Sequence, residues 1–296
     1  MSVLPFDQRE GKIWYDGKLV DWKDAKLHVL THGLHYGSCV FEGERVYEGE
    51  VFKLHEHNVR LHKSAELLGF EIPYTLDELR DATMEVVKAQ GIVNGYIRPV
   101  AWRGSEMMAI SAQATKIHVA IAAWEWPSYF KKEAQELGLK LRTSTWRRPA
   151  PNTAPSASKA AGLYMICTMS KHDAERAGFD DALMLDYKHR VAEATGANIF
   201  LVQNGELHTP TTECILNGIT RLTVIDLAKQ AGIKVVEREI QPEEFANTQE
   251  VFLTGSAVEV TPVGAIDDYK FTVGPVTKRL REDYNNLVRG IKKAAA

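Results

Sequence analysis

The sequence predicts an α/β (α+β) protein with two domains. Its 296 residues exceed the usual size of one domain, roughly 100 to 200 residues. Strand patterns alternate with helical patterns along the chain. This alternation breaks once, between Pro127 and Gly138, where proline, aromatic and charged residues mix. We therefore expect a smaller N-terminal α/β domain over 1–126, a linker over 127–138 and a larger C-terminal domain over 139–296.

The N-terminal part predicts two hairpins, two helices and two longer strands, in that order. Short β-rich runs flank Asp16-Gly17, a strong two-residue turn signal, and the pattern repeats around Glu48-Gly49. Helical spacing follows over 55–70, with Gly69 as a plausible end. A second helix has Thr75 as its N-cap, Glu78 three residues later and Gly91 at its end. Strands are expected over 95–102 and 116–126.

The C-terminal part begins with a strand over 139–148 and a helix over about 160–177. A strand over 181–186 comes next, then a hairpin around Asn204-Gly205. After a turn at Asn217-Gly218 we expect a helix beginning near Thr220. Further strands are expected over 234–240, 250–255 and 258–266, before a charged C-terminal helix.

Composition limits the possible partners. The chain is 45% hydrophobic and 25% charged, as in an ordinary globular protein, and its formal net charge of -3 argues against nucleic acid and anionic membranes. No stretch reaches the ~18 apolar residues of a membrane span, and the first residues do not resemble an export signal. We therefore expect a cytoplasmic protein that acts on small molecules.

Cysteine and histidine spacing indicates neither a disulfide framework nor a metal site. Cys39, Cys167 and Cys214 are far apart and lack a C-x-x-C spacing. Two histidine groups lack both the H-E-x-x-H spacing and a cysteine partner, and we expect no metal there; they are His28, His32 and His35, and His55, His57 and His62. Nucleotide-binding glycine loops are also absent.

One lysine stands out in "PNTAPSASKAAGLY", residues 151–164. Lys159 lies among alanines and serines, which leave room for a ligand, and Tyr164 supplies a hydroxyl nearby. Taken alone, Lys159 would be interpreted as a solvated surface residue, as most lysines are. In this neighbourhood it suggests a lysine that forms a Schiff base with an aldehyde, and the commonest aldehyde cofactor is pyridoxal phosphate.

Such a cofactor needs an anion site for its phosphate and an acid at its pyridine nitrogen. "LNGITR", residues 216–221, runs from a turn into a helix, whose first N–H groups suit an anion, although an ordinary capped helix start gives the same pattern. Glu193 lies in "VAEATGANIF" among small and apolar residues, where a carboxylate requires a cationic partner. A pyridinium is one such partner.

Seven segments, in order, resemble those of fold-type IV pyridoxal-phosphate transaminases, and most closely those of branched-chain amino acid aminotransferases. The resemblance runs nearly end to end and covers "LTHGLHYGSCVFEGER", "EHNVRLHKSA", "GYIRP", "APNTAPSASKAAGLY", "EATGANIF", "LNGITR" and "GSAVEVTP". It implies the fold-type IV architecture, in which a small N-terminal α/β domain is joined by an interdomain loop to a larger, barrel-like C-terminal domain.

The resemblance also implies the cofactor-binding residues. Lys159 would carry the Schiff base of pyridoxal 5'-phosphate and act as the catalytic acid and base, and Glu193 would keep the pyridine nitrogen protonated. Tyr164 would lie near the phenolic oxygen of the ring. The phosphate would be bound by Arg60, Ile219, Thr220 and Ser256, and Leu216 would be a further cofactor-binding residue. Without the family, Arg60 reads as a solvated helix residue.

The substrate residues are implied in the same way. An apolar pocket would be formed by Tyr36, Phe41, Trp126, Tyr129 and Tyr164, although each aromatic alone is consistent with core packing. Gly43 would be a further substrate-binding residue. The substrate carboxylate would be oriented by Tyr96, Arg98, Ser256 and Ala257. Arg45 is the candidate that would meet the distal carboxylate of glutamate.

The implied reaction is a ping-pong transamination. L-leucine, L-isoleucine or L-valine gives its amino group to the cofactor and leaves as a branched 2-oxo acid, and 2-oxoglutarate then leaves as L-glutamate. One methylene is worth only ~1 to 3 kcal/mol in an apolar pocket, so activity on all three amino acids is expected. The family also implies a homodimer or a higher homo-oligomer.

One segment departs from the family pattern and keeps other activities open. The chain reads "RGSEMMAISA" after "YIRPVAW", with Arg103 added and Met108-Ala109 where Met-Gly is usual. The alternatives are a D-amino acid or (R)-amine transaminase or an aminodeoxychorismate lyase of the same fold; Tyr96 and Arg98 argue against them. A non-catalytic ligand-binding protein on this fold is a remote alternative, because Lys159 and Glu193 are both present.

Overall fold

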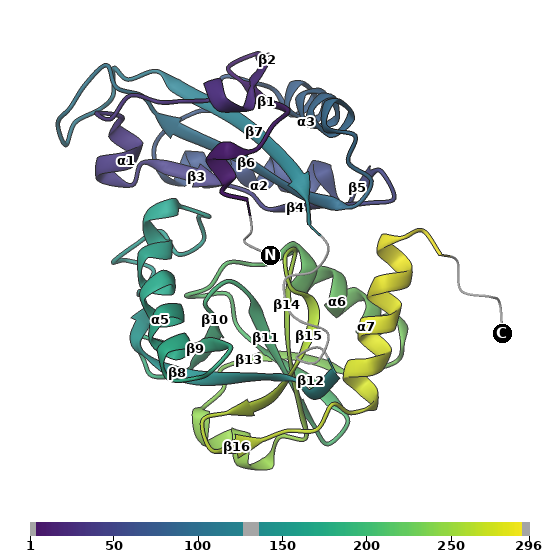
Figure 1. The fold of residues 1–296 in the computed structure, drawn as a ribbon. Helices are drawn as coiled ribbons and strands as arrows, with labels where there is room; N and C mark the ends of the chain where they lie inside the picture. Colours follow the sequence, from purple (N-terminus) through teal and green to yellow (C-terminus); the bar gives the residue numbers. More distant parts are fainter. Residues whose placement is uncertain (1–3, 127–135, 292–296) are drawn as a thin grey trace. The chain divides into compact units, whose positions relative to one another are not determined.

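The structure is a computed structural model that describes residues 4–126 and 136–291 (Figure 1). Contacts divide the chain into two units. The first unit contains Met1–Pro127 and Ser158–Gly162, and the second contains Ser128–Ala157 and Leu163–Ala296. Most of the expected linker over 127–138 lies outside the described residues.

The first unit contains an antiparallel sheet. Over the described residues it has seven strands, in the order β2-β1-β7-β6-β4-β5, with β3 paired to β6. The strands are β1 (Lys12–Tyr15), β2 (Lys18–Asp21), β3 (Cys39–Phe41), β4 (Glu44–Tyr47), β5 (Glu50–Val51), β6 (Gly95–Arg103) and β7 (Ile117–Glu125). The helices are α1 (His32–Tyr36), α2 (Leu54–Leu67) and α3 (Leu76–Gln90), and the 3-10 turns are η1 (Phe6–Gln8) and η2 (Trp22–Asp24).

Local sequence signals explain the turns and helix ends of this unit. Asp16 and Gly17 have φ of 47° and 94°, which gives the left-handed pair that a tight hairpin requires. Thr75 and Glu78 form the reciprocal capping box at the start of α3, and Gly91 ends that helix with φ of 64°. The predictions for these elements are confirmed.

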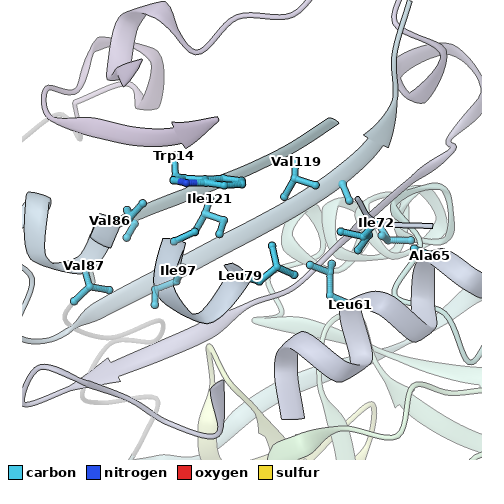
Figure 2. Close-up of a cluster of buried hydrophobic side chains, with 14 of the residues drawn as sticks. Trp14, Leu61, Ala65, Ile72, Leu79, Val86, Val87, Ile97, Val119 and Ile121 are labelled. Carbon is cyan, nitrogen blue, oxygen red and sulfur yellow. The ribbon is translucent and has the colours of Figure 1, made fainter. Parts of the chain in front are cut away.

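The core of the first unit lies where α2 and α3 pack against the sheet (Figure 2). Strand residues Ile97 and Ile121 and helix residues Leu61 and Leu79 are all 0% exposed. Helical spacing brings Leu61 and Ala65 onto one face of α2, and the alternation of the strands turns every second side chain toward that face.

The second unit has nine strands among the residues that the structure describes, and six of them close into a barrel. The order is β10-β9-β8-β15-β14-β11, and the pairing of β10 with β11 completes the ring. The strands are β8 (Leu139–Arg148), β9 (Asp181–Asp186), β10 (Val191–Ala194), β11 (Asn198–Gln203), β12 (Glu206–Pro210), β13 (Val235–Arg238), β14 (Glu250–Gly255), β15 (Glu259–Ile266) and β16 (Tyr269–Lys270). The helices are α5 (Tyr164–Arg176), α6 (Ile219–Gln230) and α7 (Pro275–Val288), and the 3-10 turns are η3 (Ala161–Leu163) and η4 (Pro242–Asn247).

The helices of the second unit cover the strands of the barrel. Helix α5 lies against β8 and β9, and α6 and α7 lie against β14 (Figure 1). A buried cluster contains Leu139 and Leu141 of β8, Leu183 of β9 and Leu253 of β14. The alternation of Leu139 and Leu141 shows why the pattern over 139–148 predicts a strand with one apolar face.

The helix predicted from residue 160 begins four residues later. Ala160 forms an isolated β-bridge with Val40, and the chain turns through η3 before α5 starts at Tyr164. Small residues favour a helix locally, but here the backbone of Ala160 extends the edge of β3. The predicted start was therefore wrong, and the predicted end at about residue 177 is confirmed by the last residue of α5, Arg176.

Candidate active site

Lys159 is held by the first unit, although most of the chain around it belongs to the second. The Ser158 hydroxyl donates to the Ser64 carbonyl at 2.9 Å, and the Lys159 N–H donates to the Ser64 hydroxyl at 3.0 Å. The Phe41 N–H donates to the Lys159 carbonyl at 3.2 Å. The backbone on both sides of the lysine is therefore fixed by β3 and α2.

The amine of Lys159 lies close to an aromatic ring. Its Nζ is 4.9 Å from the centroid of Phe41. Burial lowers the pKa of Lys159 to about 8, and Arg60 and Arg98 lower it as well, against the opposing effects of Glu42 and Tyr96. With this pKa roughly a tenth of the amine is neutral at pH 7, far more than for an ordinary lysine. The amine is therefore suited to nucleophilic and general-base chemistry.

Arg98 and Tyr96 lie on the same strand, β6, two residues apart and on one face. The Arg98 guanidinium is 4.6 Å from the Phe41 centroid and donates to the Tyr96 hydroxyl at 3.3 Å. Among the described residues the buried Nε of Arg98 has no hydrogen-bond partner. A buried donor without an acceptor is costly, so this nitrogen fits a ligand carboxylate.

Gly43 makes room for Tyr96. A Cβ atom at this position would lie 1.9 Å from the Tyr96 hydroxyl oxygen, so any other residue would displace the ring. Arg45 is the cross-strand neighbour of Tyr96, is 5% exposed, and lies 5.3 Å from the ring of Tyr47. The register therefore brings Gly43 and Arg45 next to Tyr96.

Aromatic rings extend this face of the sheet. Tyr96 lies 4.9 Å from Trp126 and 5.3 Å from Trp124, measured between ring centroids. Tyr36 is 45% exposed, and its ring is 4.6 Å from that of His32. Tyr129 lies outside the described residues. The structure thus groups Trp126 with Tyr96 and places Tyr36 at the end of α1.

A buried ion pair beside this face was missed by sequence reasoning. Glu42 accepts from Nε and a terminal nitrogen of Arg60 at 2.7 and 2.8 Å, and from Nδ1 of His57 at 2.7 Å. Alternation along β3 and β4 gives a signal for it, since Glu42 occupies the same face as buried Val40 and Val46. An acid on a core face requires a cationic partner.

Glu193 of β10 has its own partners in the second unit. Arg148 Nε lies 3.1 Å from one carboxylate oxygen, and the Asn198 side-chain amide donates to the other at 3.2 Å. Asn198 also donates to the Leu216 carbonyl at 3.0 Å, which ties Glu193 to the segment before α6. The expected cationic partner of Glu193 is therefore present within the chain, and Arg148 is a second residue that the sequence did not reveal.

The first turn of α6 carries Ile219 and Thr220, whose N–H groups have no acceptor within the helix. Gly218 is the N-cap and provides no side-chain cap. Arg221, 0% exposed, anchors the turn through the Pro210 carbonyl and Glu237, at 2.9 and 2.6 Å. An anion suits this helix start, because the helix dipole and the first N–H groups both favour negative charge there.

The remaining candidates of the second unit lie at element ends. Tyr164 is the first residue of α5 and is half-buried. Ser256 and Ala257 are half-buried in the turn that joins β14 to β15.

Arg103 holds the segment "RGSEMMAISA", which differs from the family pattern. Its guanidinium donates to the carbonyls of Ala112 and Gly69 at 2.9 and 2.7 Å, and His32 Nε2 lies 2.9 Å from the Ala109 carbonyl oxygen. Arg103 therefore fixes the loop to the end of α2.

Neither a metal site nor a membrane span is found over the described ranges 4–126 and 136–291. No group of three or more His, Cys, Asp or Glu side chains is arranged to hold a metal ion there. None of the helices in those ranges is long and apolar enough to cross a membrane.

Comparison with known proteins identifies the family of this chain. Residues 39–266 match the family described as amino-transferase class IV. The branched-chain-amino-acid aminotransferase of Pseudomonas aeruginosa is 43% identical over 295 residues, which cover 97% of this chain and 96% of that protein. The crystal structure of the Escherichia coli branched-chain amino acid aminotransferase has a TM-score of 0.93 and 38% identity, covering 96% of this chain and 97% of that one.

A second similar structure was determined with its cofactor. The branched-chain amino acid aminotransferase from Thermobaculum terrenum, in its pyridoxal-phosphate form, has a TM-score of 0.87 and 30% identity, with coverage of 96% and 95%. The fold and the family match define a class IV aminotransferase, and the chain belongs to that family. Its relatives at about 40% identity are branched-chain enzymes.

Proposed function

We propose that this protein is a branched-chain amino acid aminotransferase that uses pyridoxal 5'-phosphate. It transfers the amino group of L-leucine, L-isoleucine or L-valine to 2-oxoglutarate. The near full-length similarity to enzymes of that name supports the substrate class. We further propose that it acts in the cytoplasm as a homodimer or a higher homo-oligomer.

The observation that carries this proposal is that Lys159 and Arg98 lie beside the ring of Phe41 and that Arg98 contacts Tyr96. Lys159 offers an amine with a pKa of about 8, Arg98 a buried nitrogen without a partner in the described structure, and Tyr96 a hydroxyl. An amine beside a carboxylate receptor is the arrangement that an α-amino acid requires.

The residues present fit the proposed cofactor. Lys159 supplies the amine for its aldehyde, and Glu193, paired with Arg148, supplies an acceptor for its ring nitrogen. Arg60 and the first N–H groups of α6 are donors of the kind that bind phosphate. Tyr164, Leu216 and Ser256 complete the assignment. When bound, pyridoxal phosphate withdraws electrons from the substrate and stores its amino group between the two halves of a ping-pong reaction.

The chain's own residues then have distinct roles. Lys159 anchors the cofactor, and its released amine moves the proton of the substrate's α-carbon, which its lowered pKa permits near neutral pH. Arg98 and Tyr96, with Ser256 and Ala257, orient the carboxylate. Tyr36, Phe41, Gly43, Trp126, Tyr129 and Tyr164 surround an aliphatic side chain, and Arg45 receives the distal carboxylate of glutamate.

A visible absorption titration tests this function. Protein loaded with pyridoxal phosphate is mixed in parallel with L-leucine, D-alanine and an (R)-arylalkylamine. We expect a cofactor band that L-leucine alone converts to the amine form. Conversion by D-alanine or by the amine instead would assign the protein to the other activities of this fold. No band at all would contradict the role of Lys159.

A further inference from the structure

Glu42 is a fully buried carboxylate with three side-chain nitrogen donors around it, and the Gly43 N–H donates to it at 3.3 Å. It is 0% exposed, and Nε and Nη2 of Arg60 approach it at 2.7 and 2.8 Å. His57 of the same helix, α2, donates from Nδ1 at 2.7 Å. The two guanidinium contacts form a parallel fork, which fixes the plane of the guanidinium as well as its position.

Glu42 is an anion in this setting. Burial alone would raise its pKa, but Arg60 and His57 hold the pKa far below the usual range of a glutamate. Burial lowers the pKa of His57 despite its bond to Glu42, and Arg60 and Lys159 lower it further. The imidazole is therefore neutral and donates through Nδ1, while Arg60 supplies the charge that balances Glu42.

The geometry of the fork has a consequence for Arg60. A guanidinium carries five N–H donors in one plane, and Glu42 occupies the edge formed by Nε and Nη2. Donors that point away from Glu42 lie in the same fixed plane. Arg60 is otherwise a long side chain that would lose much rotamer freedom on binding an anion. Held by Glu42, it has lost that freedom already.

We propose that Glu42 is a positioning residue that fixes the Arg60 guanidinium for binding the phosphate group of the cofactor. This inference rests on the proposed function, since it takes pyridoxal phosphate as the ligand of Arg60. Glu42 itself touches Arg60, and its effect on the cofactor passes through that side chain. His57 supports it by donating to the carboxylate oxygen that Nη2 also contacts.

The chain offers a matched control two residues away. Glu44 is also 0% exposed and on the same face of the sheet, but neither of its oxygens has a hydrogen-bond partner in the described part of the chain. Glu42→Gln and Glu44→Gln therefore replace the same side chain at the same depth, although only the first removes a negative charge. Only the first alters the fork on Arg60.

The experiment compares the affinity of the cofactor-free protein for pyridoxal phosphate with its affinity for pyridoxal, which lacks the phosphate. Both are titrated by absorbance against wild type, Glu42→Gln, Glu44→Gln, Arg60→Lys and the Glu42→Gln/Arg60→Lys double variant. We expect Glu42→Gln to reduce the preference for the phosphorylated form by roughly 10- to 100-fold, because a charge-assisted fork is lost. Any effect of Glu42→Gln on the Lys159 amine acts on both ligands alike and cancels in the preference, and the preference of Glu44→Gln should match wild type.

The double variant identifies the route of the effect. If Glu42 acts through Arg60, adding Glu42→Gln to Arg60→Lys should change the preference by much less than it does in wild type. An unchanged preference in Glu42→Gln, an equal loss for both ligands, or full additivity would each overturn the inference. Should Glu42→Gln not fold by circular dichroism, Glu42→Asp serves instead. Asp is too short to keep both contacts, so an unchanged preference there overturns the inference too.

The same titration separates this inference from the proposed function. If wild type binds pyridoxal as tightly as pyridoxal phosphate, the phosphate assignment of Arg60 fails, and the proposed cofactor site fails with it. If wild type prefers the phosphate and Glu42→Gln keeps that preference, only the positioning role of Glu42 is wrong.

Discussion

The charge state of each ionisable residue near Lys159 is set by its immediate partners. Glu42 and Glu44 are two residues apart and equally buried, yet Arg60 and His57 keep the first ionised while burial raises the pKa of the second. Burial lowers the pKa of Lys159 as well, to about 8. These three side chains show that burial alone does not determine whether a side chain is ionised. A nearby group of opposite charge determines it.

Lys159 gives the first prediction. Lys159→Ala should fold like wild type and lose turnover by several orders of magnitude, because one amine serves as cofactor anchor and as acid-base catalyst. The measurement is kcat with L-leucine and 2-oxoglutarate, with the thermal midpoint as the control for folding. A variant that keeps near-normal kcat would remove Lys159 from the mechanism.

Glu44 gives a prediction about pH. Burial, with Glu42 nearby, raises its pKa well above the ordinary value, so the folded carboxyl is neutral where the unfolded one ionises. The stability associated with this neutral form is full below the unfolded pKa, near 4.3, and is lost as pH rises through the folded pKa. Relative to Glu44→Gln, wild type should lose up to ~1.4 kcal/mol per pH unit in that window.

Urea unfolding at pH 5, 6, 7 and 8 measures this difference. We expect the free energy of unfolding of Glu44→Gln, minus that of wild type, to increase at each pH step until the folded carboxyl ionises. A difference that is constant over the four pH values would show that Glu44 has the same pKa in both states.

The sequence reveals single residues better than it reveals pairs. Lys159 stands out among small residues, and Glu193 among apolar ones, so the sequence alone predicts both. Arg60 follows only from the family resemblance, and no sequence pattern indicates Arg148. The partner of Arg60 is 18 residues away, and Arg148 meets Glu193 only because β8, β9 and β10 are neighbours in the barrel.

At the scale of elements, local signals were sufficient wherever the stabilising interactions are local. The capping box of α3 and the left-handed turn at Asp16-Gly17 have the predicted residues. The start of α5 was misplaced, because Ala160 pairs with Val40, 120 positions earlier by sequence number. The sequence also did not predict that β10 pairs with β11 and closes the barrel. The alternation of apolar and polar residues along a strand does not indicate which strand it pairs with.

The capping box permits a quantitative test of one helix. Thr75→Ala removes the hydroxyl that accepts from the Glu78 N–H at 3.2 Å, and should lower the free energy of unfolding by ~1 kcal/mol. Thr75→Ser retains the hydroxyl and is the control. Equal stability of the two variants in urea unfolding would show that the cap contributes nothing.

The start of α6 gives a second prediction at this scale. A Cβ on Gly218 would lie 2.2 Å from the Asn198 side-chain oxygen, so Gly218→Ala must move the amide that holds Glu193. We expect lower stability and a shifted absorption band of bound pyridoxal phosphate. Gly196→Ala, where a Cβ meets nothing within 4 Å, is the stability control. A Gly218→Ala protein with wild-type stability and spectrum would contradict the coupling.

At the scale of the molecule, each unit has its own buried core and its own share of the proposed cofactor residues. Lys159 and Arg60 belong to the first unit, and Glu193 and α6 to the second. Pyridoxal phosphate at 100 times its Kd should therefore stabilise the folded protein by ~2.7 kcal/mol and slow amide hydrogen exchange in both units.

Hydrogen exchange followed by mass spectrometry checks this prediction segment by segment, with Lys159→Ala as the variant of weakened cofactor binding. Slowed exchange in α2 and in the first turn of α6 is the expected result. Protection confined to one unit would mean that the other contributes nothing to cofactor binding.

The five residues Ser158–Gly162 belong to the first unit, although the chain on either side belongs to the second. Neither unit is therefore encoded by one uninterrupted stretch of the gene. A recombination crossover between two relatives near codon 127 would take the Lys159 segment from one parent and its supports, Ser64, Val40 and Phe41, from the other. In hybrids made at that boundary, the Lys159 segment and the residues that hold it come from different parents. Hybrids that also exchange codons 158–162 keep both from the same parent.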